Sequence, residues 1–199
     1  MRIIRNLLRK IRYQIKFLGK KNNSNFYISN FKAENNLTNL MNKYGSDKGG
    51  KNNHHNYSLF YSEIFGTKRK LIKNFLEVGL GTNNTSIPSN MGESGKPLAS
   101  LMAWRDYFPN ANIFGADIDK EILKNDDRIK TCFVDQTDPS TISEMFKNFG
   151  VDKYDIIIED GLHEYNANIT FFENSISHLS NDGIFIIEDI YYKDIKKFK

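Results

Sequence analysis

The sequence of 199 residues contains a single cysteine, Cys132. One thiol excludes an internal disulfide and a metal site built from several thiolates. The lack of disulfides fits a reducing, cytoplasmic compartment. Cys132 lies in an apolar run of strand length, so we expect a small buried side chain rather than a reactive thiol.

Long hydrophobic runs are also absent. No uninterrupted apolar stretch reaches the length of a transmembrane helix. Charged residues interrupt the N-terminal segment, which excludes the apolar core of a signal peptide. The composition has ample Ile, Leu and Phe and four prolines, as expected of one globular domain with a core of its own.

Acidic residues are missing from the first 21 positions, which carry eight Lys or Arg. Apolar residues recur there at helical spacing, so residues 1–20 are predicted to form a basic amphipathic helix. Such a helix can lie on an anionic membrane surface, at the inner face of the membrane, or pack on the domain or on a second copy of the chain. Both readings stay open. We expect a linker over 21–43, Asn-rich up to Asn36, and a domain over 44–199.

Positive charge is not spread over the rest of the chain, since basic and acidic residues nearly balance from Glu34 onward. A uniformly basic nucleic-acid binder has a different distribution. No Asn-Pro-Pro-Tyr base-flipping motif follows the fourth predicted strand. We therefore expect no nucleic-acid partner.

Apolar runs of strand length alternate with helical patterns from residue 75 onward. Strands are predicted at 75–78, 112–116, 129–134, 154–158 and 184–187, and helices at 99–108, 141–149 and 167–179, with a turn at 180–183. Alternation of this kind indicates parallel strands joined by right-handed crossovers. The strands are apolar on both faces, so the fold class is α/β, a mostly parallel sheet with helices on both faces.

Acidic residues follow each predicted strand: Asp117, Asp135, Glu159 with Asp160, and Glu188 with Asp189, while Glu77 lies near the end of the first strand. A single acid here can simply cap the next helix. Five strands in succession argue for more, because the carboxyl ends of parallel strands share one edge, where ligands bind. The stretch YDIIIEDGLHEY thus predicts a rigid apolar strand with a polar, functional tip.

The first strand ends in the turn Glu77-Val78-Gly79-Leu80-Gly81. A dinucleotide-binding turn has a third glycine that leads directly into a helix. This turn has no third glycine in that position. A short turn of this kind suits S-adenosylmethionine better, with Gly79 and Gly81 letting the backbone approach the cofactor. Asp117 can accept both ribose hydroxyls, and the third-strand residues Asp135 and Gln136 follow at the adenine position.

From about residue 44 to 190, the chain resembles the macrocin-type sugar O-methyltransferases, a metal-dependent branch of the class I methyltransferases. The stretches that carry the resemblance are GSDKGGKNNHHNY, FLEVGLG, PLASLMAWRDYFPNANIFGADID, CFVDQTD, YDIIIEDGLHEY and GIFIIEDI. The resemblance implies a Rossmann-like fold and methylation of a sugar hydroxyl, on a surface polysaccharide or a glycosylated metabolite.

The resemblance also implies roles for single residues. Asp160, Glu188 and Asp189 would hold Mg²⁺, and His163 would be the general base. Glu77, Gly79, Asp117, Asp135 and Gln136 would line the cofactor. The D-K-G and H-x-Y elements correspond to Asp47, Lys48, Gly49, His55 and Tyr57, a segment that would fold over cofactor or substrate as a lid, with Lys48 and Tyr57 on the cofactor.

These residue types suit the reaction. A sugar hydroxyl is a weak acid, and a hard dication held by carboxylates lowers its pKa. Carboxylates without cysteine favour Mg²⁺ over Zn²⁺, and histidine suits proton acceptance near neutral pH. Two alternatives remain: a catechol-type small-molecule O-methyltransferase, which uses similar metal chemistry, and a catalytically inactive binding module.

The second alternative arises because the class I fold normally continues after the fifth strand with a helix and two more strands. Only YYKDIKKFK follows Asp189. A truncated reading frame, a fragment, or an edge supplied by another chain would each explain this. The fifth strand is then expected to be an exposed edge, and the isolated chain to be unstable or inactive.

Overall fold

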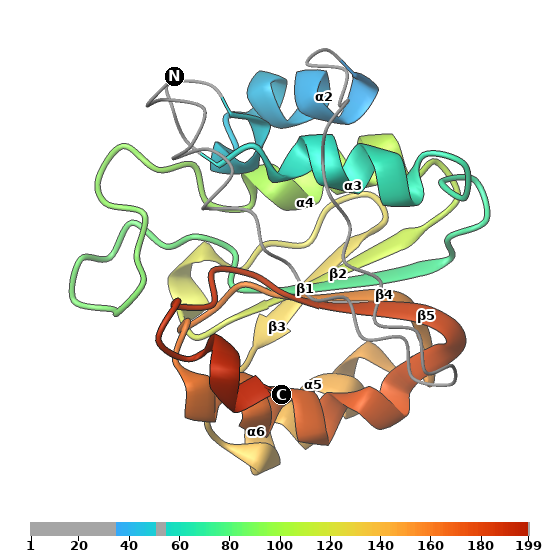
Figure 1. Cartoon of the computed structure of the whole chain (residues 1–199). Helices are drawn as coiled ribbons and strands as arrows, with labels where there is room; N and C mark the ends of the chain where they lie inside the picture. The colour runs from blue at the N-terminus through green and yellow to red at the C-terminus, as the bar shows by residue number, and fades with distance from the viewer. Residues whose placement is uncertain (1–34, 51–54, 199) are drawn as a thin grey trace. The chain divides into compact units, whose positions relative to one another are not determined.

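The computed structural model describes residues 35–50 and 55–198 (Figure 1). The chain divides into two units, Met1–Asn30 and Phe31–Lys199, and all described residues belong to the second. The predicted helix over 1–20 lies outside the described residues. Within the described part, no helix has both the length and the apolar character needed to span a bilayer.

A five-stranded sheet forms the centre of this unit. Its strands are β1 (Asn74–Val78), β2 (Asn112–Asp117), β3 (Ile129–Phe133), β4 (Tyr154–Glu159) and β5 (Leu179–Ile187). They pair in the order β3-β2-β1-β4-β5, and all four pairings are parallel. The predicted α/β class is confirmed. The strand order reverses between β1 and β4, and in open α/β sheets ligands bind at the carboxyl ends beside such a point.

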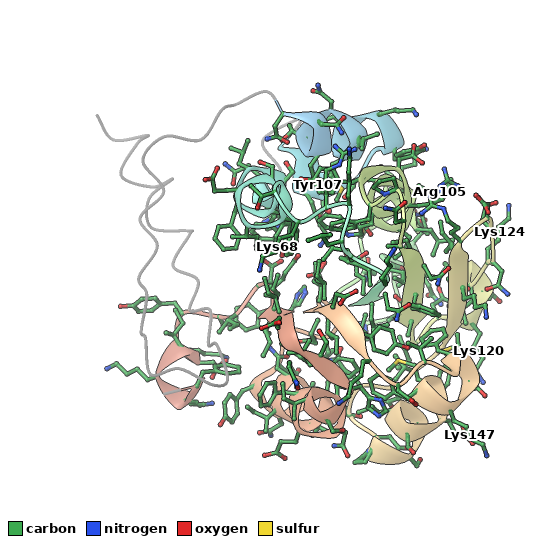
Figure 2. The ribbon with its side chains drawn as sticks, turned by 90° about the vertical axis from the view of Figure 1, so that its right-hand side faces the viewer. Lys68, Arg105, Tyr107, Lys120, Lys124 and Lys147 are labelled. Carbon is green, nitrogen blue, oxygen red and sulfur yellow. The ribbon has the colours of Figure 1, made fainter. Side chains whose placement is uncertain are left out.

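Helices cover the sheet on both faces (Figure 1). The helices α2 (Asn36–Tyr44), α3 (Tyr57–Phe65) and α4 (Ala99–Tyr107) lie on one face, and α5 (Pro139–Phe149) and α6 (Tyr165–Ser175) on the other. Short 3-10 turns are η1 (Asp47–Gly49), η3 (Lys120–Ile122), η4 (Ile176–His178) and η5 (Ile195–Phe198). Figure 2 shows Lys124 and Lys147 at the outside of this layered body, while the Lys120 ammonium lies 4.4 Å from the centre of the Phe133 ring.

Alternate residues of each strand enter two separate cores, as the pleat of a strand requires. On the α5–α6 side, Leu76 and Ile157 pack with helix residues such as Phe146. On the α3–α4 side, Phe75 lies 5.0 Å from the Trp104 ring, centroid to centroid. Glu77 shares this second face with Phe75, so its carboxylate points toward the α3–α4 layer.

Helix α2 lies where the sequence predicted a linker over 21–43, and this part of the prediction is corrected. Leu37 and Met41, one turn apart, are fully buried. Asn35 caps the helix by accepting a hydrogen bond from the Thr38 N–H at 2.8 Å, and Gly45 ends it with φ 84°. A run of Asn residues read as polar loop thus contains an N-cap and an apolar stripe.

The boundaries around β5 also differ from the prediction. Residues 180–183, predicted as a turn, belong to a strand that begins at Leu179, and α6 ends at Ser175. The pairing with β4 shifts register between Tyr154 and Ile156. Among the described residues β5 is an edge strand, where a bulge and polar side chains are tolerated because one side faces no partner strand.

Candidate functional site

Parallel pairing brings the strand-ending acids together. The Asp160 N–H donates to the Val78 carbonyl at 2.8 Å, and the Glu188 N–H donates to the Glu159 carbonyl at 2.8 Å. These two bonds extend the ladder one residue beyond β4 and β5. As a result, Asp160 and Glu188 leave the sheet at the same edge, held by backbone geometry rather than by flexible loops.

Asp160, His163 and Asp189 form a cluster at this edge. One ligand atom from each lies within 4.8 Å of the other two. The His163 Nε2 is 3.1 Å from the Asp160 Oδ1. Burial alone would lower the pKa of His163, but the hydrogen bond and the charges of Asp160 and Asp189 outweigh it and raise that pKa.

The backbone at two of these residues is strained. His163 has φ 62° and Asp189 has φ 49°, a left-handed conformation that costs free energy for any residue with a side chain. Such conformations concentrate where a side chain must point in a required direction. Here they turn both side chains toward one point.

Glu188 has a different surrounding from the one predicted. Its Oε2 accepts a hydrogen bond from the Lys48 Nζ at 2.6 Å, and its Oε1 accepts one from the Tyr61 hydroxyl. It is not in the three-residue cluster of potential ligands found among the described residues. The predicted set of Asp160, Glu188 and Asp189 is therefore assembled only in part, with His163 as the third neighbour of the two aspartates.

Lys48 lies in the middle of these acids. Besides Glu188, its Nζ contacts Asp160, and it lies 3.7 Å from the Glu77 Oε1. Its side chain is 3% exposed. The contact of Lys48 with the cofactor stays a prediction. In this structure the ammonium faces the carboxyl groups of Glu77, Asp160 and Glu188.

Helix α3 adds hydroxyl groups to the same site. Tyr57 donates a hydrogen bond to the Asp189 Oδ1, and its contact with the cofactor stays a prediction. His55 Nε2 lies 3.7 Å from the Asp189 Oδ2. The segment predicted as a lid thus reaches the acids at the sheet edge through Lys48, His55 and Tyr57. Tyr61 was not predicted; its position one helical turn after Tyr57 is the signal that could have found it.

The acids in this group are unequally ionised. Burial raises the pKa of Asp160, but the Lys48 ammonium and the His163 hydrogen bond reverse this and lower it to about 2. Burial, followed by the negative charge of Asp160, raises the pKa of Glu188 well above its ordinary value. Burial raises that of Glu77 to about 7, although Lys48 and Ser100 act in the opposite direction. One buried ammonium does not neutralise all these carboxyl groups.

The glycine turn after β1 has the predicted geometry. Gly79 and Gly81 have φ of 88° and 79°. A Cβ at Gly79 would lie 2.0 Å from the Asp160 carbonyl oxygen, so only glycine fits where β1 and the segment after β4 pass each other. This close approach joins the turn to the acid cluster.

The predicted nucleoside-binding residues follow β2 and β3. Asp117 accepts the Leu80 N–H at 2.6 Å and the Asp119 N–H at 2.8 Å, which ties the end of β2 to the glycine turn. The predicted residue Asp135 accepts the Thr137 N–H at 2.9 Å and is partly exposed.

Gln136 and Glu77, both predicted to line the cofactor, are buried. The Gln136 amide donates to Glu159 at 2.8 Å and accepts the Leu162 N–H at 2.7 Å, so it braces the segment after β4. Glu77 is fully buried, and its Oε2 accepts a hydrogen bond from Ser100 at 2.7 Å. Ser100 was also not predicted, because nothing in the α4 pattern separates it from an ordinary helix residue.

The residues at the sheet edge fit a hard divalent cation. Asp160 and Asp189 offer carboxylate oxygens within reach of each other, and the His163 nitrogen is close by. Oxygen donors of this kind suit Mg²⁺, and the excess of buried carboxyl groups over ammonium groups favours an added cation. The donor chemistry therefore agrees with the expectation from the sequence.

No family model matches the chain. The chain is 31% identical to the 8-demethyl-8-(2-methoxy-alpha-L-rhamnosyl)-tetracenomycin-C 3'-O-methyltransferase of Streptomyces olivaceus. The aligned 155 residues cover 78% of this chain and 37% of that protein. The chain is also 29% identical over 159 residues to the demethylmacrocin O-methyltransferase of Streptomyces fradiae, with 80% and 37% covered. The chain thus spans well under half the length of these relatives.

Among solved structures, the chain is similar to the MycE methyltransferase of the mycinamycin biosynthetic pathway in complex with Mg and SAH. The TM-score is 0.66 and the identity 25%, over 83% of this chain and 42% of the other. The five parallel strands and two helical layers match this Rossmann-like fold. Both the predicted fold class and the predicted resemblance are confirmed.

Proposed function

Since the chain has the class I methyltransferase fold and is a homologue of the macrocin-type sugar O-methyltransferases, we propose that it is part of an enzyme of this kind. The reaction is transfer of a methyl group from S-adenosylmethionine to a sugar hydroxyl. The observation that carries the proposal is the convergence of Asp160, His163 and Asp189 at the carboxyl edge of the sheet.

Asp160 and Asp189 would hold Mg²⁺, with His163 beside them. Glu188 would become a further ligand if Lys48 moved away from it. When bound, the ion lowers the pKa of an acceptor hydroxyl, and the sulfonium cofactor supplies an electrophilic methyl group. The chain's own contribution is to fix these acids on adjacent strands and to keep the acceptor oxygen aligned.

His163 accepts the proton in this scheme. With Nε2–H donating to Asp160, the lone pair is on Nδ1, which is the nitrogen that takes the hydroxyl proton. S-adenosylmethionine would supply the methyl group to the acceptor oxygen, and its sulfur would keep the electron pair of the broken carbon–sulfur bond. Asp160 orients the imidazole and stabilises the imidazolium that results.

Gly79 and Gly81 would give the cofactor access to the backbone after β1. Asp117, held by the Leu80 and Asp119 N–H groups, keeps further lone pairs for ribose hydroxyls, and Asp135 follows at the adenine end. Contacts of Lys48 and Tyr57 with the cofactor stay a prediction, while the polar atoms of both face the acids in this structure.

The acceptor would enter beside His163. A hollow of about 520 Å³ is lined by residues that follow His163 and Asp189 in the chain, among them Tyr165, Tyr191 and Lys193. Tyr191 is exposed and offers a ring surface that suits a sugar, whereas the Tyr165 ring packs against Phe198. The name of the Streptomyces olivaceus relative describes a rhamnosyl group on tetracenomycin C, which favours a glycosylated metabolite over a polysaccharide.

The proposal predicts that His163→Ala lowers methyl transfer roughly 10²- to 10⁴-fold, the usual contribution of a general base. The measurement is transfer of a labelled methyl group to glycosylated polyketides, with Mg²⁺ and with EDTA. Binding of S-adenosylhomocysteine, measured by calorimetry, should stay unchanged in this variant. His178→Ala, in η4 directly before the start of β5 and thus away from the carboxyl edge, is the matched control and should keep its turnover per folded molecule.

Two results would contradict the proposal. One is transfer that is equally fast in EDTA, and the other is a His163→Ala variant as active as the parent. Transfer to simple catechols but not to glycosylated acceptors would favour the catechol-type alternative. A chain that binds neither cofactor nor acceptor would reject the assignment altogether.

A further inference from the structure

Lys48 is a buried cation beside the proposed metal site, in contact with Asp160. It lies in η1, a single 3-10 turn held in place from both ends. The Ser46 side chain caps the turn, and Gly50 ends it with φ 75°. A Cβ at Gly49 would collide with the Asn42 side chain, so the turn packs directly on α2. The ammonium is thus presented by a rigid segment.

Three strands supply carboxylates to this ammonium: Glu77 from β1, Asp160 after β4 and Glu188 after β5. The contacts to Asp160 and Glu188 are direct, while Glu77 lies 3.7 Å away. Glu77 and Glu188 have no exposed surface, so water does little to screen the repulsion between them and Asp160. Without an intervening cation, these carboxylates would move apart or take up protons.

We infer that Lys48 is a positioning residue that holds Asp160 and Glu188 together when no Mg²⁺ is bound. Its ammonium then provides the positive charge that the bound ion would otherwise provide. This inference rests on the proposed function, since it assigns a role at the same site. It gives Lys48 no contact with the cofactor or the acceptor. The residue acts only through the carboxylates that it keeps side by side.

The inference predicts a specific coupling between Lys48 and Mg²⁺. In Lys48→Met, the carboxylates lose their counter-charge, and the melting temperature in EDTA should fall by roughly 10 °C, as expected for a broken buried ion pair. Millimolar MgCl₂ should recover at least half of this loss, because the added cation replaces the missing one. In the parent chain, the same MgCl₂ should raise the melting temperature by only a few degrees.

Three further variants separate this role from ordinary packing. Lys48→Arg keeps the positive charge and should lose less stability than Lys48→Met. Lys48→Met combined with Glu188→Gln removes the ammonium together with one of the carboxyl groups that face it, and should melt higher in EDTA than Lys48→Met alone. Lys147→Met, on the exposed face of α5, is the control and should respond to MgCl₂ as the parent does (Figure 2).

An equal MgCl₂ shift in the parent and in Lys48→Met would overturn the inference, and so would a double variant no more stable than the single one. If Lys48→Met is insoluble in EDTA, its soluble yield with and without MgCl₂ replaces the melting curve, and equal yields overturn the inference. Loss of S-adenosylhomocysteine binding in Lys48→Met, with an unchanged MgCl₂ response, would reassign Lys48 to the cofactor. Failure of the proposed function differs from all of these, since the parent would then transfer no methyl group.

Discussion

His163 and Asp189 show how single residues decide this site. Both adopt left-handed backbone conformations that no sequence pattern predicts, and the side chains of both lie close to Asp160. The free-energy cost of each conformation is on the order of 1 kcal/mol or more and must be offset by surrounding contacts. The hydrogen bonds from Tyr57 to Asp189 and between His163 and Asp160 are the contacts that do so.

Cys132 provides a prediction at the residue scale. Burial raises the pKa of its thiol to about 12, so roughly one molecule in ten thousand carries the reactive thiolate at pH 8, against about a quarter for a free cysteine. Labelling by iodoacetamide should therefore be very slow in the folded protein and become fast in urea. The labelling rate should still rise with pH at pH 10. Rapid labelling of the folded chain at pH 8 would contradict the burial of this side chain.

The site is built by secondary-structure elements that are far apart in the sequence. Helix α3 and η1 contribute Tyr57, Tyr61 and Lys48, while β4 and β5 contribute the acids that these groups contact. Helix α2 supports η1 and also packs on α4, where the Tyr44 hydroxyl donates to Asp106. Contacts of α2 with η1 and α4 thus help to fix the groups that face the acids.

The α2–α4 contact predicts a pH-dependent stability difference. Partial burial raises the pKa of Asp106, but the hydrogen bonds from Tyr44 and Arg105 and the charge of Arg105 lower it overall (Figure 2 labels Arg105). A lowered pKa means that the stabilisation is present above the unfolded pKa of about 3.9 and is lost as the pH falls through the folded value. Asp106→Asn should cost about 1 kcal/mol at pH 7 by urea unfolding, a modest amount because the group is partly exposed.

The same comparison near pH 3 should show a smaller difference between Asp106→Asn and the parent, because the parent carboxylate is then losing its charge. Asp127→Asn, at a mostly exposed carboxylate, is the matched control and should change stability little at either pH. A constant difference between pH 7 and pH 3 would show that the Asp106 charge has no part in holding α2 on α4.

The described unit as a whole consists of two cores on the two faces of one sheet. The aromatic core between the sheet and α3–α4 contains Trp104, Phe75 and Phe108, with ring centroids 5.0 to 5.6 Å from the tryptophan. The core on the other face is formed with α5 and α6. Because every strand contributes to the same sheet, we expect the two cores to unfold together.

Trp104 makes this expectation measurable, since it is the only tryptophan and is fully buried. Its emission should shift to the red in a single urea transition, with the same midpoint as the loss of circular dichroism at 222 nm. Excitation at a wavelength that tyrosine does not absorb keeps the fluorescence specific to Trp104, and thus to the α3–α4 core. An earlier fluorescence midpoint would mean that this core unfolds separately from the sheet and α5–α6.

Much of the architecture followed from patterns that act over short distances. Apolar runs of strand length and helical spacing located the five strands to within a few residues, and the acids after them identified the functional edge, because parallel strands share their carboxyl ends. The exceptions have local causes. Helix α2 was not predicted because its sequence is rich in Asn. The start of β5 was not predicted because it contains polar residues, which an edge strand tolerates.

By itself, the sequence determined the α/β class, the parallel sheet, the glycine turn at Gly79 and the presence of Asp160, His163 and Asp189 at one edge. Only the tertiary structure decided that Lys48 and Tyr57 face these acids rather than the cofactor turn, and that Glu188 pairs with Lys48. The physical reason is that strand periodicity is set by near neighbours in the chain, whereas the partner of a buried charge is set by packing between segments more than 100 residues apart.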